Sequence, residues 1–465
     1  MAFYFRIPLP SNPGCADSTG EPKRSPPPGL VVCYNWSVVL LEHLVSAASG
    51  QEFRPSRDHK LMREVMTMSL TGAGFVSPNP FVGALVLADG AEAGRGVHRV
   101  FGQDHAEAAA LKMAGECARG GELFVNLEPC NHQGNQPPCT AAIAAAGIRR
   151  VVFGGYDPNP LTRRQARDAL EKAGVQVVGP LMPFSVARLN DSYYHWHSRQ
   201  QPLITLKLAV SMDGRLAAAS GDSQWISEKA GRGYSHFLRQ THDAVMVGIG
   251  TVLADNPRLT VRPALLREFV DEYRQRMRIR QPARVILDPD FRLFRECNVA
   301  EELERGLVEE ENKLSSPPLS IFKKAKPVRE ELPWLVIAGK ESAAPTGLRL
   351  LSGVEIVGLA GQGRVSFGEL WEKLKDYGVR SVLVEGGARV AQELIAQNEF
   401  TRLDVILAPV LLGGDGLSFS PALKLKHVED GPVLRHLLLL PLRRNLLLSG
   451  YRTDWLARAV GELGL

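Results

Sequence analysis

The sequence contains few of the features that mark membrane proteins or nucleic-acid-binding proteins. Its net charge is only +5 over 465 residues, and no run of lysine and arginine stands out, so no broad basic surface is indicated. The most apolar stretch, residues 30–48, is interrupted by Asn35, Glu42 and His43 and is too mixed for a membrane-spanning helix. No basic segment directly precedes it, which argues against a signal peptide. We expect neither a nucleic-acid partner nor a membrane partner.

Cysteine is also scarce. Of six cysteines, only Cys130 and Cys139 are closely spaced within a motif, whereas a disulfide framework needs a denser and more regular set. This pattern is typical of a reduced protein and predicts a cytoplasmic location. The weak positive charge would suit a small anionic substrate. The length indicates two or three domains.

The stretch from His105 to Cys139 carries the clearest chemistry. It opens with His-Ala-Glu, where Glu107 is the acid, and it later contains Pro-Cys and a second cysteine, Cys139. Imidazole nitrogen and thiolate sulfur are zinc ligands, and a catalytic zinc site leaves one position for water, whose pKa the metal lowers. A glutamate two residues after the histidine then carries protons rather than binding the metal. This order of residues is the zinc-deaminase signature.

The local pattern is compatible with that site. Residues 106–118 are rich in helix formers, which places His105 at a helix start. Residues 122–128 read as a buried strand, and Cys139 begins a second alanine-rich helix. Taken singly, His-Ala-Glu is an ordinary helix start and two cysteines are often buried small hydrophobes. In combination they predict zinc bound by His105, Cys130 and Cys139, with Glu107 as the catalytic residue.

Four segments resemble the deaminase half of the bifunctional deaminase/reductase family of riboflavin biosynthesis. They are SPNPFVGALVL, GRGVHRVFGQDHAEAAAL, LEPCNHQGNQPPCTAAIAAAGI and DPNP. The eight residues between the cysteines suit this family better than the two of nucleic-acid and cytidine deaminases. The resemblance covers roughly residues 58 to 425. It implies that Asn79 and His98 lie at the substrate pocket, although turn chemistry alone explains Asn79 equally well.

The division into domains follows from composition and from the resemblance. Residues 1–55 do not resemble the family and read as a dispensable, disordered extension, or as upstream sequence translated from a misplaced start. Residues 56–200 form the zinc deaminase, expected to be a cytidine-deaminase-like three-layer α/β domain because strands and helices alternate. Residues 201–465 form the reductase, which resembles the α/β fold of dihydrofolate reductase. Within it, residues 298–332 are strongly charged and read as a surface insertion.

The second half lacks the six-residue glycine fingerprint of a Rossmann dinucleotide site. Gly386-Gly387 before a helix, and less clearly Gly248 and Gly250, could expose backbone N–H groups to a phosphate, and alone these would be ordinary tight turns. The resemblance favours NADPH. It implies cofactor contacts by Ala209, Trp225, Thr251, Asp255, Gly387, Ala388, Arg389 and Val390. It implies substrate contacts by Ser223, Arg239, Leu259, Arg262 and Glu385. We add Lys207, because an unpaired lysine is rare on a central strand.

The sequence departs from the family at two places that are expected to bind the ribose-phosphate of the substrate. Asn135 and Gln136 stand where the family usually has a basic residue before Pro-Pro-Cys. After Asp-Pro-Asn-Pro, Arg163 and Arg164 replace a glycine-flanked basic turn. We expect one of these arginines to take over the phosphate contact; the alternative is that both are solvated on the first turn of a helix over residues 163–173.

The resemblance therefore implies a bifunctional enzyme of riboflavin biosynthesis that uses Zn²⁺ and NADPH. We expect it to deaminate 2,5-diamino-6-(5-phosphoribosylamino)pyrimidin-4(3H)-one and then to reduce the ribosyl side chain to ribityl. We expect a homo-oligomer. Residues 436–450 are apolar enough to be buried within the domain or to pair at an interface. The alternatives are a deaminase of the same pathway without reductase activity, and a nucleic-acid or nucleoside deaminase.

Overall fold

The computed structural model describes residues 56–133, 137–269, 278–293, 335–340, 354–359 and 365–462. These residues form two compact units. The first holds residues 56–198 with Arg278 and residues 456–462, and the second holds the described residues of 199–269 and 279–455. The predicted extension 1–55, the charged insertion 298–332, and Asn135 and Gln136 lie outside the described residues. No described helix is long and apolar enough to span a membrane.

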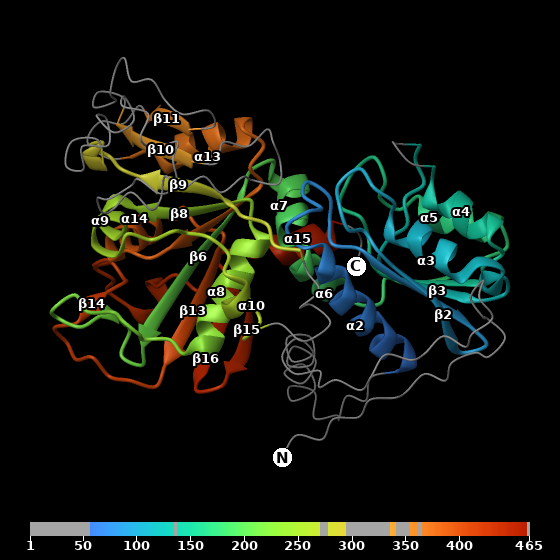
Figure 1. Cartoon of the computed structure of the whole chain (residues 1–465), viewed down its shortest axis with the longest axis horizontal. Coiled ribbons are helices and arrows are strands. Elements are labelled where there is room, and N and C mark those ends of the chain that lie inside the picture. The colour runs from blue at the N-terminus through green and yellow to red at the C-terminus, as the bar shows by residue number, and fades with distance from the viewer. Residues whose placement is uncertain are drawn as a thin grey trace. The chain divides into compact units, whose positions relative to one another are not determined.

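The first unit is a three-layer α/β domain around a mixed five-stranded sheet of order β2-β1-β3-β4-β5 (Figure 1). Strands β1, β2 and β3 are antiparallel neighbours, whereas β3, β4 and β5 run parallel. The strands are β1 (Gly83–Ala88), β2 (Ala91–Val97), β3 (Glu122–Leu127), β4 (Arg150–Gly155) and β5 (Gln176–Val178). The helices are α2 (Arg57–Ser69), η1 (Leu70–Gly72), α3 (Ala106–Ala114), η2 (Gly115–Ala118), α4 (Cys139–Ala145), α5 (Ala166–Lys172), α6 (Pro183–Leu189) and α7 (Asp191–Arg199).

Helices cover both faces of this sheet, as the alternation of strands and helices predicts. On one face, Ala110, Ile143 and Leu170 of α3, α4 and α5 pack into one apolar core with the strands. On the other face, Met62 of α2 and Val186 of α6 lie against Gly154 of β4. The expected α/β class is confirmed.

The structure differs from the sequence pattern at three places. Strand β2 escaped the pattern analysis because glycine and charged residues dominate its sequence, and only pairing with β1 makes it a strand. Helix α7 lies in what reads as a polar connector, and its buried Tyr193 and Tyr194 explain why it is ordered. Helix α5 begins at Ala166, so Arg163 and Arg164 precede it rather than forming its first turn.

The second unit is built on a nine-stranded sheet of order β11-β10-β9-β8-β12-β6-β13-β16-β15. All neighbours from β11 to β13 are parallel, and β16 and β15 add antiparallel strands. The strands of the unit are β6 (Leu203–Ser211), β7 (Arg215–Ala217), β8 (Ala244–Gly248), β9 (Ala283–Leu287), β10 (Leu335–Lys340), β11 (Val354–Leu359), β12 (Ser381–Glu385), β13 (Arg402–Ala408), β14 (Leu417–Ser418), β15 (Arg435–Leu442) and β16 (Asn445–Tyr451). Its helices are α8 (Lys229–Thr241), α9 (Ile249–Asp255), α10 (Pro263–Leu266), α13 (Phe367–Asp376), α14 (Ala388–Gln397), η6 (Val428–Asp430) and α15 (Trp455–Gly461), whose later residues group with the first unit.

This sheet is also covered on both faces. Leu370 of α13 and Leu394 of α14 pack into the core beneath one face. Helix α8 lies over β6 and β13 on the other face (Figure 1), where Tyr234 donates a 2.5 Å hydrogen bond to Asp404. Because β8, β12 and β6 are adjacent and parallel, their carboxyl ends meet at one edge of the sheet, which is where ligands bind in open α/β sheets.

Candidate active sites

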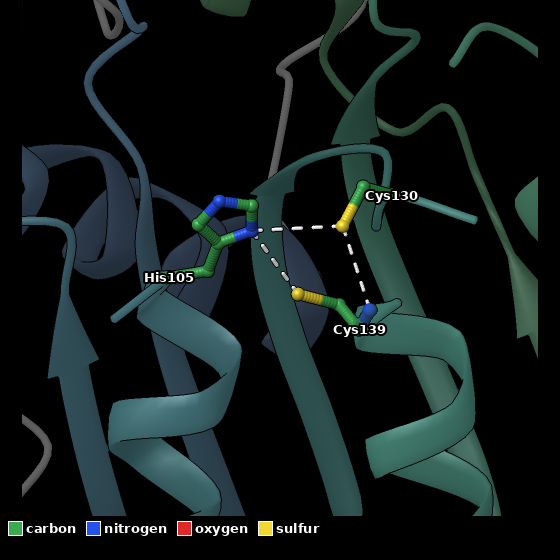
Figure 2. Close-up of side chains that lie close together, drawn as sticks. All are labelled: His105, Cys130 and Cys139. Carbon is green, nitrogen blue, oxygen red and sulfur yellow. Dashed lines mark hydrogen bonds between the residues drawn. The ribbon is translucent and has the colours of Figure 1, made fainter. Parts of the chain in front are cut away.

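The three predicted metal ligands converge in the first unit. Their ligand atoms all lie within 4.8 Å of one another. The His105 Nδ1 atom is 3.3 Å from Cys139 Sγ and 3.5 Å from Cys130 Sγ, and Figure 2 shows all three side chains pointing to one spot. These separations suit a tetrahedral ion with bonds of about 2.0–2.3 Å to nitrogen and sulfur, so the residues fit zinc.

The elements of the domain place these ligands as the sequence indicates. His105 is the N-cap of α3, and Cys139 is the first residue of α4. The backbone N–H of Cys139 donates to Cys130 Sγ at 3.4 Å, which ties the loop after β3 to the start of α4. The N-terminus of a helix carries a partial positive charge, which favours the thiolate form of a cysteine placed there.

Two glycines let α3 lie against the sheet. A Cβ atom on Gly96 would be 2.0 Å from the Ala106 carbonyl oxygen, and one on Gly94 would be 2.4 Å from the Ala110 oxygen. No side chain fits at these distances. The close approach of β2 to the first turns of α3 fixes the height of His105 and Glu107 above the sheet.

The electrostatics of the cluster favour a bound cation. The hydrogen bond from the Cys139 thiol lowers the pKa of Cys130 to about 4, and the same shared proton raises the pKa of Cys139. The two sulfur atoms lie within 4.8 Å of each other and share one proton. A metal ion can replace that proton and bind both sulfur atoms as thiolates. Both thiols are free. Cys117, in contrast, is disulfide-bonded, so the expectation of a fully reduced chain is wrong for this residue.

Glu107 lies beside the metal ligands in the first turn of α3 and is 4% exposed. Burial, followed by the charge of Cys130, raises the pKa of Glu107 to about 7. A carboxyl group whose pKa lies near neutrality can both accept and release a proton at working pH. This is the property that a deaminase requires of its proton carrier.

Asn79 and His98 form a hydrogen-bonded pair next to this cluster. The His98 Nδ1 atom is 3.0 Å from the Asp104 carbonyl oxygen, so this nitrogen carries the proton and Nε2 accepts from Asn79 Nδ2 at 3.1 Å. Burial lowers the pKa of His98. The rings of His98 and His105 are 5.7 Å apart. The Asn79 side chain therefore bonds to His98 near the metal ligands, and its role in a turn does not explain this contact.

In the second unit, charged side chains gather between the sheet and α8. Lys207 of β6 pairs in register with Glu385 of β12 and Asp404 of β13, so the three side chains share a face. Arg239 of α8 donates to Glu385 Oε2 from Nε at 2.9 Å and from Nη2 at 2.5 Å. Burial alone would raise the pKa of Glu385, but Arg239 and Lys207 outweigh it and lower the pKa. Burial lowers the pKa of Lys207.

This group has an unused hydrogen-bonding position. Glu385 is 7% exposed, and its Oε1 atom is buried without a partner among the described residues. An unpaired buried carboxylate oxygen is costly, which is an independent sign that a ligand completes the site.

The glycine turn lies at the end of the same strand. Gly386 and Gly387 follow Glu385 with φ of 77° and 60°, and Gly387 is the N-cap of α14. A Cβ atom on Gly387 would be 3.0 Å from Thr251 Oγ1 of α9, whereas one on Gly250 would meet open space. Exposed backbone beside a helix N-terminus fits the phosphate groups of a dinucleotide, so these residues fit NADPH.

Other residues of the predicted reductase site lie around this edge. Ala209 is on β6, two residues after Lys207, and Val390 is on the buried face of α14. The described hydrogen bonds and contacts do not join Ser223, Asp255 or Arg389 to the group. Trp225 is 67% exposed, and its ring faces the Arg232 guanidinium at 4.4 Å.

The comparisons with known proteins agree with this arrangement. A family model for the cytidine and deoxycytidylate deaminase zinc-binding region matches residues 55–155, and one for the RibD C-terminal domain matches residues 202–433. The riboflavin biosynthesis protein RibD of Aquifex aeolicus is 35% identical over 378 residues, which cover 81% of this chain and 94% of that protein. The chain belongs to the RibD family.

Further RibD proteins show the same extent of similarity. RibD of Escherichia coli is 32% identical over 81% of this chain and 94% of its own. A solved diaminohydroxyphosphoribosylaminopyrimidine deaminase/5-amino-6-(5-phosphoribosylamino)uracil reductase from Thermotoga maritima has a TM-score of 0.64 at 29% identity, covering 84% of this chain and 97% of that one. Like other RibD proteins, the chain is a bifunctional deaminase and reductase of riboflavin biosynthesis, with zinc and NADPH as cofactors. Both domains are present over nearly the full length of the relatives, which supports the bifunctional enzyme over a deaminase alone.

Several residues with a structural part in the RibD sites were not found by motif. Glu128 is 4% exposed and accepts backbone N–H groups of Arg164 at 2.8 Å and of Ala166 at 3.2 Å. It thereby links the loop of Cys130 to the loop before α5. Asp157 accepts from Thr162 at 2.6 Å and from Tyr193 at 3.0 Å. Only contacts distant in sequence reveal these roles.

Proposed function

We propose that the first domain deaminates 2,5-diamino-6-(5-phosphoribosylamino)pyrimidin-4(3H)-one and that the second reduces 5-amino-6-(5-phosphoribosylamino)uracil. The observation that carries this proposal is the buried Glu107 beside His105, Cys130 and Cys139, in a chain that also has a complete RibD reductase domain. The printed name of the Thermotoga maritima relative gives the same two activities.

In the deamination, water adds to the ring carbon that bears the amine, and ammonia leaves. Zinc, when bound, supplies the Lewis acid that makes water reactive at neutral pH. Glu107 takes the proton of the water and returns it to the departing amine. Asn79 and His98 form the polar wall that positions the pyrimidine.

In the reduction, NADPH, when bound, would supply a hydride to the anomeric carbon, and a proton from solvent would reach the ring oxygen as the ring opens, so that the ribosyl group becomes ribityl. Thr251 and Gly387 hold the phosphates of NADPH, with further contacts from Ala209, Trp225, Asp255 and the first turn of α14. The Glu385 Oε1 atom accepts a hydrogen bond from a hydroxyl group of the substrate. Lys207, beside Glu385, stabilises negative charge on an oxygen of the ribosyl group. Ser223, Arg239, Leu259 and Arg262 complete the substrate contacts.

A coupled assay tests both activities. Purified full-length protein is given the diaminopyrimidine phosphate with and without NADPH, and ammonia and NADPH absorbance are followed. Ammonia should appear in both cases, and NADPH should be consumed at a matching rate once deaminated product forms. Ammonia without any NADPH consumption would contradict the second half of the proposal.

We also infer that Arg163 or Arg164 grips the substrate phosphate in the deaminase. Glu128, two residues before Cys130 in the sequence, accepts a hydrogen bond from the backbone N–H of Arg164. The Arg164 guanidinium lies 5.3 Å from the centre of the Tyr156 ring. Arg163 is exposed on the same loop. A cation at this wall supports a phosphate, since guanidinium donates in a rigid fork.

Replacing the arginine that grips the phosphate with alanine should raise the deaminase KM by about one to two powers of ten, because hydrogen bonds to charged groups contribute about 1.5–3 kcal/mol. Arg163→Ala and Arg164→Ala are compared with the substrate and with its dephosphorylated nucleoside. Arg167→Ala serves as a control, because its guanidinium is bound to Glu171 and to the Val177 carbonyl. If both variants prefer the phosphorylated substrate over the nucleoside as strongly as the wild type does, neither arginine binds the phosphate and both are solvated.

We infer in addition that the enzyme is a homo-oligomer. Strand β15 is the last strand of its sheet, and Leu439 and Pro441 on it pair with Leu448 and Leu446 of β16 on one partly exposed face. Leu437 of the same strand is 44% exposed. A second copy presents the same face and can cover it symmetrically. Leu437→Glu should lower the mass measured by light scattering; an unchanged mass would refute this interface.

The remaining expectations stay predictions. A cytoplasmic location and the lack of nucleic-acid and membrane partners rest on the sequence. Cell fractionation checks the first, and binding assays with single-stranded DNA and lipid vesicles check the others.

A further inference from the structure

The segment Leu259–Arg262 in the reductase is irregular yet tightly held. Leu259 is 3% exposed and has a φ of 54°, a backbone conformation that is uncommon for a branched residue. The next three residues are each held by a side chain from elsewhere. Such a segment keeps one conformation only because its surroundings impose it.

The three anchors follow one another along the backbone. Arg239 Nη1 donates to the Thr260 carbonyl at 2.9 Å. Gln281 accepts the Val261 N–H at 2.7 Å and donates to the Val261 carbonyl at 3.3 Å. The Arg262 N–H donates to His236 Nδ1 at 3.0 Å.

His236 is suited to a permanent acceptor role. It is 3% exposed on α8, and its Nδ1 atom can accept a hydrogen bond only when that nitrogen carries no proton. Arg239, Arg262 and Lys207 surround it, with Glu385 as the acidic group. Burial, followed by the charge of Arg239, lowers the pKa of His236 to about 3, so the ring is neutral at physiological pH.

The anchored segment ends in a concentration of positive charge. Burial, then Arg239, Arg232 and Arg258, lowers the pKa of Arg262, and Glu385 acts in the opposite direction. Four guanidinium groups near one carboxylate leave an excess of positive charge, which suits a phosphate group.

We propose that His236 and Gln281 are positioning residues of the reductase, which hold the backbone of Val261 and Arg262 so that the Arg262 guanidinium meets the phosphate of the substrate. This inference rests on the proposed reductase function. Neither side chain needs to touch the substrate; each fixes the direction in which Arg262 leaves the backbone.

The test compares two substitutions of one residue in the full-length enzyme. In His236→Asn, the amide oxygen can take the place of Nδ1 as acceptor, whereas His236→Leu has no acceptor. With 5-amino-6-(5-phosphoribosylamino)uracil, His236→Leu should raise the substrate KM about tenfold or more, because small misplacements of a binding group are costly. His236→Asn should keep the KM within about threefold of the wild type. The KM for NADPH should not change in either variant.

Two further variants keep the test decisive. His242→Leu removes another buried histidine, whose ring bonds to Leu238 and Thr205 at 2.8 and 2.9 Å, and it should lower the melting temperature without a selective rise in KM. If His236→Leu does not fold, Gln281→Leu tests the neighbouring anchor with the same expected rise.

The outcomes separate this inference from the function on which it rests. Arg262→Ala should raise the substrate KM at least as much as His236→Leu. If Arg262→Ala leaves the KM unchanged, the assignment of Arg262 to the substrate fails. If Arg262→Ala raises the KM but His236→Leu and Gln281→Leu do not, the positioning role is refuted and the reductase function stands.

Discussion

Glu107→Gln is expected to slow deamination by about 10²–10⁴-fold, the usual contribution of general acid–base catalysis, while zinc stays bound. Glutamine keeps the size of the side chain but cannot accept or release a proton at neutral pH. The position is buried, and burial raises the pKa of Glu107 to about 7.

The measurement is ammonia release by the full-length variant, with zinc content determined by elemental analysis. Glu116→Gln is the matched control, because Glu116 is exposed in η2, two residues beyond the end of α3, and the substitution should leave turnover unchanged. The reductase step, started from the deaminated intermediate, should be unaffected. Near wild-type ammonia release by Glu107→Gln would remove this residue from the mechanism.

Cys130→Ser is expected to abolish zinc binding and with it deaminase activity. The serine hydroxyl is not deprotonated at neutral pH, whereas the hydrogen bond from Cys139 lowers the pKa of Cys130 to about 4 and makes it a thiolate. The substitution is nearly isosteric, so the hydrogen bond from the Cys139 N–H can persist. The loss is therefore chemical rather than a collapse of the loop.

Zinc per chain and ammonia release are measured together, and reduction of the deaminated intermediate by the same sample serves as the internal control. A preparation that keeps the reductase activity has folded in its second domain. Full zinc content in Cys130→Ser would show that the metal is bound by other residues.

The zinc site could be predicted from the sequence because it is built from short-range motifs. His105 and Glu107 share one helix turn, and Cys130 and Cys139 lie on either side of one loop, so the order of residues nearly fixes their geometry. Strand β3, expected over residues 122–128, could be predicted for a related reason, because all its residues are buried and most of them are apolar.

The features that could not be predicted from the sequence depend on contacts between residues that are distant in the chain. Strand β2 is defined by pairing with β1 and by the close approach of α3 at Gly94 and Gly96, not by its own propensity. The helical start at Ala166 is set by Glu128, which binds the N–H groups of Arg164 and Ala166. No local pattern encodes a carboxylate 36 residues away.

The sequence by itself indicated the chemistry of this protein: a zinc deaminase, from residues that lie close together in the chain, followed by an NADPH-dependent reductase, from its resemblance to the family. The tertiary structure alone decided how those residues are held. Parallel pairing brings Lys207, Glu385 and Asp404 to one face of the sheet, and packing of α8 brings His236 to the backbone of Arg262. The physical reason is that hydrogen bonds and charges act over a few ångströms in space, and only the folded chain brings residues that are far apart in sequence within that range.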